Sequence, residues 1–150
     1  MKTTTALALV SAVSGAVIEQ RQTPTPEFDV TNFSANCQPH SVLCFFSFNV
    51  ATTTTPASAT SCSITVQGPD FLPAVGLTGC EDSRFSWSFE PRDGGAHAVT
   101  VNWESAPSFN QTGSHLVQPA DVVREDHGSV VTERYVGPAS FVISPLQSIP

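Results

Sequence analysis

The stretch that decides the fold is CEDSRFSWSFE (80–90), in which aromatic residues take every second position, at Phe85, Trp87 and Phe89, with serines between them. This period of two is typical of a β-strand, because successive side chains point to opposite faces of a sheet. Phenylalanine (10 residues) far outnumbers tryptophan (2) and tyrosine (1), and it lacks the polar group that suits an aromatic residue to a wet surface. We therefore expect one wall of a core, and a ligand platform is the less favoured alternative.

The same alternation recurs along the chain. In SVLCFFSFNV (41–50), Cys44, Phe46, Phe48 and Val50 share one face and would oppose the aromatic row. Turn signals such as GPD, RDGG and NQTG separate the other predicted strands, at 28–33, 61–66, 84–89, 96–103, 114–117, 129–135 and 139–143. About eight short strands predict an all-β fold, a compact antiparallel β-sandwich or barrel. Residues 51–60 are predicted to be a loop, and 119–126 could form one helical turn led by Pro119.

The first residues have the features of an export signal. A lysine precedes an apolar run, and small residues end at Ala16, which predicts a signal peptide over 1–16 with a second processing site at Arg21. The rest forms a single secreted β domain, 27–150. No stretch approaches the roughly 18 to 20 apolar residues of a transmembrane helix, so we expect an extracellular protein with no membrane partner.

The net charge argues against one further class of partner. The chain carries a formal net charge of −7, and its arginines form no run. An acidic surface repels phosphates, so we expect no nucleic-acid partner.

Four cysteines, Cys37, Cys44, Cys62 and Cys80, fit two disulfides in an exported chain, and their spacing matches no zinc template. If 28–33, 41–50 and 61–66 form a meander, Cys44 lies about four residues, or roughly 13 Å, from the position opposite Cys62. A disulfide needs α-carbons within about 7 Å, which favours Cys37 with Cys44 and Cys62 with Cys80. No thiol would then remain for a covalent dimer.

Few residues suggest chemistry. The chain has no nucleophile elbow, no zinc-protease helix and no phosphate loop, so we expect no catalytic residues, cofactor or metal. Carboxylates that could serve as acid or base are Asp121, Glu125 and Asp126, although a solvated surface explains them more simply. The histidines lie on separate segments, at His40, His97, His115 and His127.

Two further pairs of residues are candidates for surface roles. Trp103 and Tyr135 end their strands near turns and are the best candidates for exposed aromatic residues, although strand ends are more often buried. Asn32 in NFS and Asn110 in NQT are possible N-glycosylation sites, and Asn110 beside a glycine turn is the better acceptor.

The order of motifs FDVTNF, FSFNV, CSITV and CEDSRFSWSF resembles the Alternaria major allergen family of fungal secreted proteins, which includes hypersensitive response-inducing elicitors. The resemblance covers about residues 27–103. It implies a compact all-β domain, a shared disulfide at Cys62 and Cys80, and no established catalytic residues. The second disulfide of the allergen type lies late in the chain, where this sequence has no cysteine, so Cys37 and Cys44 would form the second bridge here.

These observations leave two functional hypotheses. The favoured one is a non-enzymatic fungal elicitor or effector that binds a host protein or cell-wall component and modulates plant defence. The alternative is a carbohydrate-binding or cell-wall-active module. Exposed coplanar tryptophan and tyrosine would favour sugar binding, whereas a polar surface over buried aromatic residues would favour protein recognition.

Overall fold

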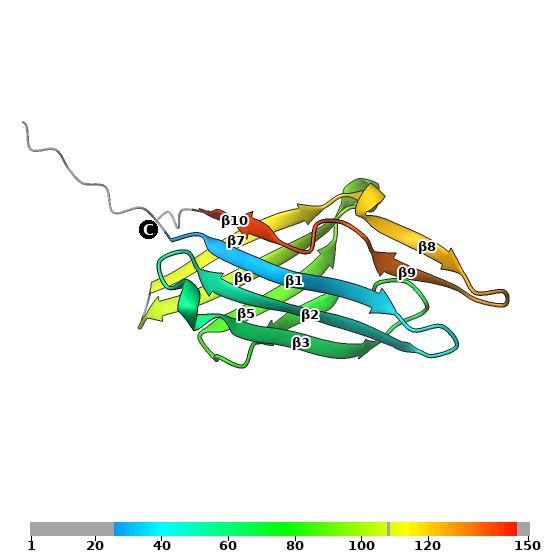
Figure 1. The fold of residues 1–150 in the computed structure, drawn as a ribbon, viewed down its shortest axis with the longest axis horizontal. Coiled ribbons are helices and arrows are strands. Elements are labelled where there is room, and N and C mark those ends of the chain that lie inside the picture. Colours follow the sequence, from blue (N-terminus) through cyan, green and yellow to red (C-terminus); the bar gives the residue numbers. More distant parts are fainter. Residues whose placement is uncertain (1–25, 108, 147–150) are drawn as a thin grey trace, which may run out of the picture.

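The computed structural model of the protein describes residues 26–107 and 109–146, which form two antiparallel sheets packed face to face (Figure 1). The first sheet has the order β3-β2-β1-β9-β8, with β10 also paired to β1. Its strands are β1 (Phe28–Cys37), β2 (Leu43–Thr52), β3 (Thr60–Gln67), β8 (Val122–Asp126), β9 (Val131–Tyr135) and β10 (Phe141–Ile143). The predicted all-β sandwich is confirmed, whereas the predicted signal peptide, 1–16, and Arg21 lie outside the described residues.

The second sheet has the order β11-β7-β6-β5-β4. Its strands are β4 (Val75–Gly79), β5 (Phe85–Pro91), β6 (His97–Ala106), β7 (Phe109–Val117) and β11 (Pro145–Leu146). Short 3-10 turns, η1 (Pro56–Ser58), η2 (Asp93–Gly95) and η3 (Pro119–Asp121), lie in the connections.

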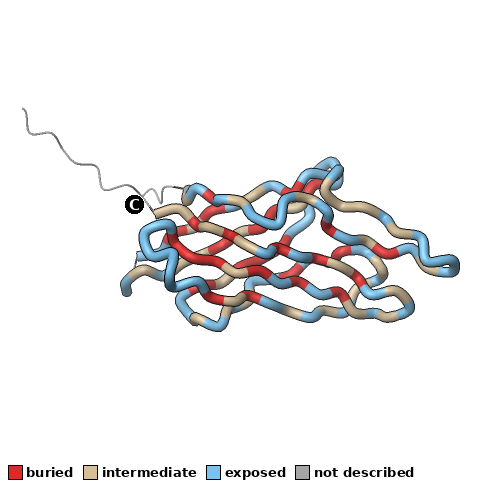
Figure 2. The backbone as a smooth tube through the Cα atoms, in the orientation of Figure 1, coloured by how far each residue is buried: buried red, intermediate tan, exposed pale blue. Residues whose placement is uncertain are grey.

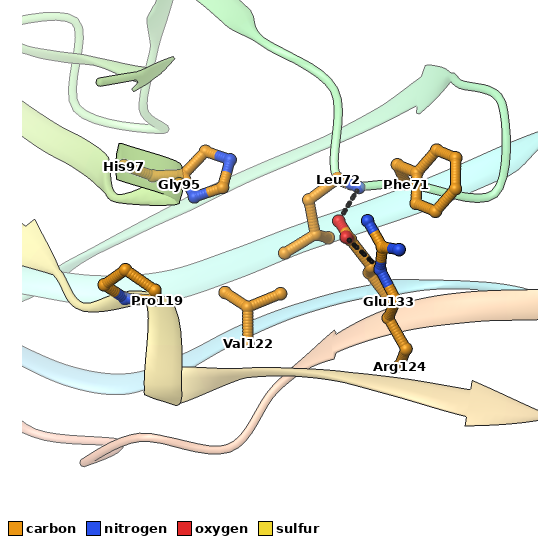
Figure 3. A pocket seen from close by; sticks show the side chains of 8 residues that line it. All are labelled: Phe71, Leu72, Gly95, His97, Pro119, Val122, Arg124 and Glu133. Carbon is orange, nitrogen blue, oxygen red and sulfur yellow. Dashed lines mark hydrogen bonds and ion pairs between the residues drawn. The ribbon is translucent and has the colours of Figure 1, made fainter. Parts of the chain in front are cut away.

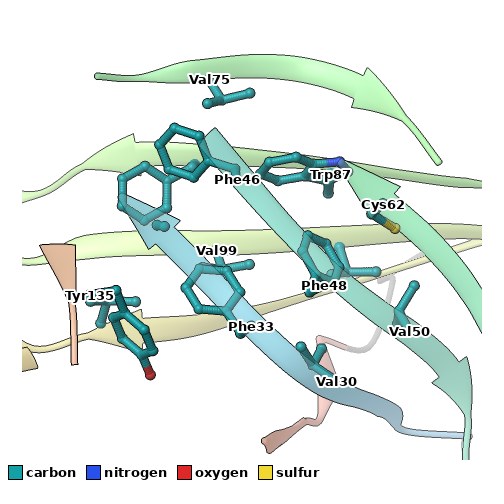
Figure 4. Packing of buried hydrophobic residues seen from close by; sticks show 14 of the residues in the cluster. Val30, Phe33, Phe46, Phe48, Val50, Cys62, Val75, Trp87, Val99 and Tyr135 are labelled. Carbon is teal, nitrogen blue, oxygen red and sulfur yellow. The ribbon is translucent and has the colours of Figure 1, made fainter. Parts of the chain in front are cut away.

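The aromatic row of β5 is a wall of the core. Phe85, Trp87 and Phe89 are at most 3% exposed, and the Trp87 ring lies 6.2 Å from Phe46 and 5.0 Å from Phe48 in the opposing sheet (Figure 4). Alternation points the aromatic residues into the core and the serines between them to the outer face of the sheet, where Ser86 is half-buried and Ser88 is buried. The expectation that this row is core rather than a platform is confirmed. Figure 2 shows buried residues interspersed with more exposed ones along β1 and β2 as well.

A β-bulge in β1 keeps its apolar residues inside. The register with β2 shifts between Thr31 and Ser34, and Asn32 there has a φ of 55°. Asparagine tolerates this left-handed conformation better than most residues. The extra residue moves the inward set from even positions such as Val30 to odd positions such as Phe33, so both are buried.

Both predicted disulfides are present. Cys37 and Cys44 are direct cross-strand partners on β1 and β2, with Cα atoms 4.0 Å apart, and Cys62 joins Cys80 between the sheets at 4.2 Å. β1, β2 and β3 form the predicted meander, and Cys44 lies opposite Val66, four residues along the strand from Cys62. The antiparallel register therefore explains the pairing.

The chain has strands that the sequence patterns did not reveal, namely β4, β8 and β11. Pro119 does lead a single turn, η3, but Val122–Asp126 continues as β8 rather than as helix. The reason is tertiary: β8 pairs with β9, and Arg124 faces Glu133 directly across the ladder. β4 and β11 are short and contain glycine and proline, so their alternation is too weak to recognise.

Candidate functional site

A cleft of about 430 Å³ lies where the β8–β9 hairpin meets the loops of the second sheet (Figure 3). The lining residues come from widely separated segments and are Phe71, Leu72, Gly95, His97, Pro119, Val122, Arg124 and Glu133. This volume is within the range of small-ligand sites, roughly 300 to 1,000 Å³. We regard it as the candidate recognition site of the described residues.

One wall of the cleft is His97, the first residue of β6. Its ring stacks on Phe89, with centroids 4.7 Å apart and planes 14° from parallel. Burial lowers the pKa of the His97 imidazole, although the Glu133 carboxylate raises it in part. His97 is therefore neutral at pH 7, and its enclosed Nδ1 has no hydrogen-bond partner among the described residues.

Glu133 and Arg124 form the opposite wall, with Leu72 and Val122 between them and His97 (Figure 3). The Glu133 side chain is only 13% exposed, and both of its oxygens have partners: Oε2 accepts a 3.0 Å hydrogen bond from the Leu72 N–H, and Oε1 accepts a 3.3 Å bond from Arg124 Nε. The Arg124 guanidinium lies 4.8 Å from the centre of the Phe71 ring, in cation–π geometry.

The loop that carries Phe71 is fastened to the first sheet at several points. The N–H of Glu133 donates to the Asp70 carbonyl at 2.9 Å, and the N–H of Gly68 donates to Val42 at the same distance. A Cβ at position 68 would lie 3.0 Å from the Pro73 ring, so glycine allows the loop to return closely on itself. The Phe71 side is thus held in place, although the Phe71 ring itself is 43% exposed.

This arrangement suits binding better than proton transfer. Glu133 already accepts two hydrogen bonds, and the exposed lining of the cleft is about equally polar and apolar, with the His97 imidazole and the Arg124 guanidinium among its polar groups. A concave site that combines apolar side chains with fixed polar groups can bind and orient a ligand.

The carboxylates that the sequence suggested as acid or base have structural partners. Asp121 accepts a hydrogen bond from the Gln118 N–H at 3.2 Å and caps η3. Asp126 accepts one from the Gly128 N–H at 2.8 Å in the β8–β9 turn. Glu125 accepts from Arg134 Nε at 2.8 Å, and this hydrogen bond lowers the pKa of the Glu125 carboxyl.

The four histidines do not converge. His40 is exposed in the β1–β2 turn, and His115 stacks on Phe141 at 3.8 Å between the ring centres. His127 lies in the β8–β9 turn, with its Nε2 3.1 Å from the Thr132 hydroxyl. In residues 26–107 and 109–146, no group of three or more His, Cys, Asp or Glu side chains is arranged to hold a metal ion.

Tyr135 is buried and Trp103 is partly covered. Tyr135 is 7% exposed, and its hydroxyl donates to the Pro138 carbonyl at 2.7 Å. Trp103 is half-buried and stacks on Phe85, with centroids 6.1 Å apart. Burial, the outcome expected more often for strand-end aromatic residues, is confirmed for Tyr135, whereas Trp103 is partly exposed.

Both glycosylation sequons are accessible. Asn32 is exposed at the bulge of β1, and Asn110 is exposed near the start of β7. Asn110 also borders a shallow groove on the outer face of the second sheet. Their occupancy remains a prediction.

Sequence reasoning noted His97 only as one of four scattered histidines, and it missed Phe71, Leu72, Arg124 and Glu133. The sequence did contain one signal for Arg124 and Glu133. They carry opposite charges and flank the turn EDHG at positions that face each other if the segment forms a hairpin. Phe71 and Leu72 gave none, since they lie among prolines in a segment that resembles an ordinary turn.

No protein-family model matches this sequence, and no curated protein matches it significantly. Two disulfides indicate an oxidising, extracellular-type environment. Within the described residues, the structure contains no helix that is long and apolar enough to cross a membrane.

Proposed function

We propose that the protein is secreted by a fungus, acts as a non-enzymatic elicitor or effector, and modulates plant defence by binding a host protein or cell-wall component. The resemblance of residues 27–103 to the Alternaria allergen family supports the source and the setting. The acidic surface and the two disulfides suit an extracellular protein.

The observation that carries the binding proposal is the placement of the aromatic residues. Trp87 and Tyr135 are buried, and Trp103 is half-buried with one face against Phe85, so the described tryptophan and tyrosine residues do not form a set of exposed coplanar rings. The exposed Phe71 ring, by contrast, lines a cleft of mixed polar and apolar character and lies under the Arg124 guanidinium. This combination favours a partner that inserts an apolar side chain flanked by polar groups, as a protein surface does.

The cleft can be tested with a matched pair of exposed phenylalanines. Phe71 is 43% exposed at the cleft, and Phe109 is 52% exposed at the start of β7, outside it. Purified Phe71→Ala and Phe109→Ala proteins, each checked for folding by circular dichroism, should be infiltrated into leaves beside the unaltered protein and a reduced, alkylated control.

Defence activation by the folded protein, retained in Phe109→Ala and lost in Phe71→Ala, is the expected result. Equal activity of the two variants would remove the cleft from the proposal. Leaves that stay unresponsive to the folded protein would count against an elicitor altogether.

A specific feature supports the alternative, a carbohydrate-binding module. The outer face of the second sheet carries a groove of about 310 Å³, where Ser86, Asn102 and Thr112 lie in register across β5, β6 and β7. Hydroxyl and amide groups in a row can bind sugar hydroxyls, and Thr112 already donates to the Asn102 Oδ1 at 2.7 Å. A glycan-binding screen in which Asn102→Ala loses a polysaccharide bound by the unaltered protein would favour this function.

A further inference from the structure

The two sheets have five edge strands within the described residues, and four of them are protected against pairing with another chain. β10, which pairs only with β1, has just three residues. β8 carries Arg124, Glu125 and Asp126, β4 is short and contains a register shift, and β11 has only two residues and begins with Pro145. Charges, bulges and proline are the usual devices that keep an edge from adding a strand. β3, in contrast, is eight residues long, TSCSITVQ, and contains no charge, proline or register shift.

The outer half of β3 presents free hydrogen-bonding groups. The Ser61 carbonyl accepts a 2.9 Å hydrogen bond from the Glu81 N–H, so the odd-numbered residues of β3 direct their main-chain groups away from β2. The even-numbered residues are left to bond β2. For Ser63 and Thr65, no residue of the described chain supplies a main-chain partner on the outward side. β3 lies along one rim of the molecule in Figure 1, with no strand beyond it.

The surface on both sides of this edge leaves space for the side chains of an added strand. A hollow of about 410 Å³ on the outer face is bordered by Phe45, Ser47, Ser63 and Thr65, and Phe45 is 37% exposed. On the inner side, Ile64 and Val66 pack against the core but stay half-exposed. Added strands gain affinity from main-chain bonds and specificity from such alternate side-chain sites.

We propose that the edge of β3 from Ser63 to Gln67 is a docking site for an extended, basic segment of a partner protein, with an apolar residue seated beside Phe45. The segment would exchange up to about six main-chain hydrogen bonds with Ser63, Thr65 and Gln67. This site is separate from the cleft, so the inference does not depend on the function proposed for Phe71.

The acidic residues near the β3 edge distinguish between two possible occupants, a segment of a partner protein and a second copy of the chain. Glu81 lies at one end of the free edge, where it bonds Ser61, and Asp70 follows the other end, where its N–H donates to Gly68. Antiparallel pairing of two β3 strands would bring the Glu81 end of one copy to the Asp70 end of the other, between proteins of net charge −7. A peptide with lysine at both ends complements these acidic flanks.

The test uses the full chain and a fluorescent peptide, acetyl-KTVTFTVTK-amide, whose binding is followed by anisotropy. Thr65→Pro removes an outward N–H but none of the bonds to β2, and Ser63→Lys adds a charge that repels the peptide. Each should weaken binding by about tenfold or more, on the order of one lost backbone hydrogen bond. Ser34→Lys is the matched control, because Ser34 is exposed on the same sheet two strands away, and it should change the affinity less than about twofold.

Amide hydrogen exchange supplies a readout that does not depend on the variants. Saturating peptide should slow exchange at Ser63 and Thr65 by about tenfold or more, while the Ile64 amide, already bonded to β2, stays unchanged. Binding that survives both Thr65→Pro and Ser63→Lys, or unaltered exchange at Ser63 and Thr65, would overturn the proposal. Sedimentation showing a dimer that protects these amides without peptide would overturn the choice of occupant in favour of a second copy.

Discussion

Replacing Trp87 with alanine should remove a large part of the stability of the domain. Trp87 is 0% exposed, and its ring contacts both Phe46 and Phe48 of the facing sheet. A large aromatic side chain takes about 150 to 250 Å² out of water, worth roughly 4 to 6 kcal/mol at about 25 cal/mol per Å². Alanine retains a small part of that burial, and core substitutions of this kind cost about 3 to 5 kcal/mol.

One feature of Trp87 acts in the opposite direction. Its Nε1 is buried and has no hydrogen-bond partner among the described residues. A buried donor without a partner costs about 1 to 3 kcal/mol, and Trp87→Ala removes that cost together with the ring. We therefore expect Trp87→Ala to lower the free energy of unfolding by about 3 kcal/mol. Trp87→Phe, which keeps most of the ring and loses the N–H, should lower it by less than about 1 kcal/mol.

Urea unfolding followed by circular dichroism, with both disulfides intact, measures these free energies by linear extrapolation. Trp103 is the other tryptophan, so fluorescence still reports unfolding in both variants. Ser86→Ala is the neighbouring control on the outer face of β5 and should be nearly neutral. The core interpretation would be refuted by a Trp87→Ala cost below about 1 kcal/mol. A Trp87→Phe cost equal to that of Trp87→Ala would instead show that Nε1 makes a stabilising hydrogen bond.

Two other predictions follow from packing and titration. In Gly113→Ala, the new Cβ would lie 2.5 Å from the Ile143 side chain, so we expect a loss of about 1 to 3 kcal/mol in urea unfolding; Gly76→Ala, which has nothing within 4 Å, should be neutral. Burial lowers the pKa of His97 and of His115 in the folded protein. The stability that these neutral histidines contribute is therefore complete above about pH 6.5, the ordinary histidine pKa, and it declines as the pH falls below that value. Urea midpoints should therefore drop between pH 7.5 and 5.5, and the double replacement by glutamine should flatten this change.

The sequence predicted those parts of the fold that depend on local alternation. The period of two in β2 and β5 identified both walls of the core, since each residue's face follows from its position in the strand. The disulfide pairing was predictable for the same reason, because an antiparallel meander fixes which cysteines can meet. β1 was predicted only as far as Phe33, because the bulge at Asn32 breaks its alternation.

The cleft could not be predicted in this way. Its walls come from the loop after β3, the start of β6, η3 and the β8–β9 hairpin, and none of these segments has a motif that identifies it as part of a site. His97 was recognised as a histidine near a turn, yet only the packing of β6 against the opposite sheet places it across from Glu133. Sites built from distant segments depend on tertiary contacts that a local pattern does not encode.

The loop between β3 and β4 connects the cleft physically to the exposed edge. It leaves β3 at Gly68, directly after the free edge, and returns to the core at Leu72, with Phe71 held between them. Cys44 Sγ lies 3.7 Å from the Phe71 carbonyl oxygen, so the Cys37–Cys44 disulfide contacts this loop from beneath. A strand added along Ser63–Gln67 would therefore end where the loop begins. Main-chain hydrogen bonds attach that loop to Val42, just before β2, and to Glu133 in β9, so the loop links the β3 edge to the cleft. A partner long enough to occupy both would meet a preformed surface, which lowers the conformational cost of binding.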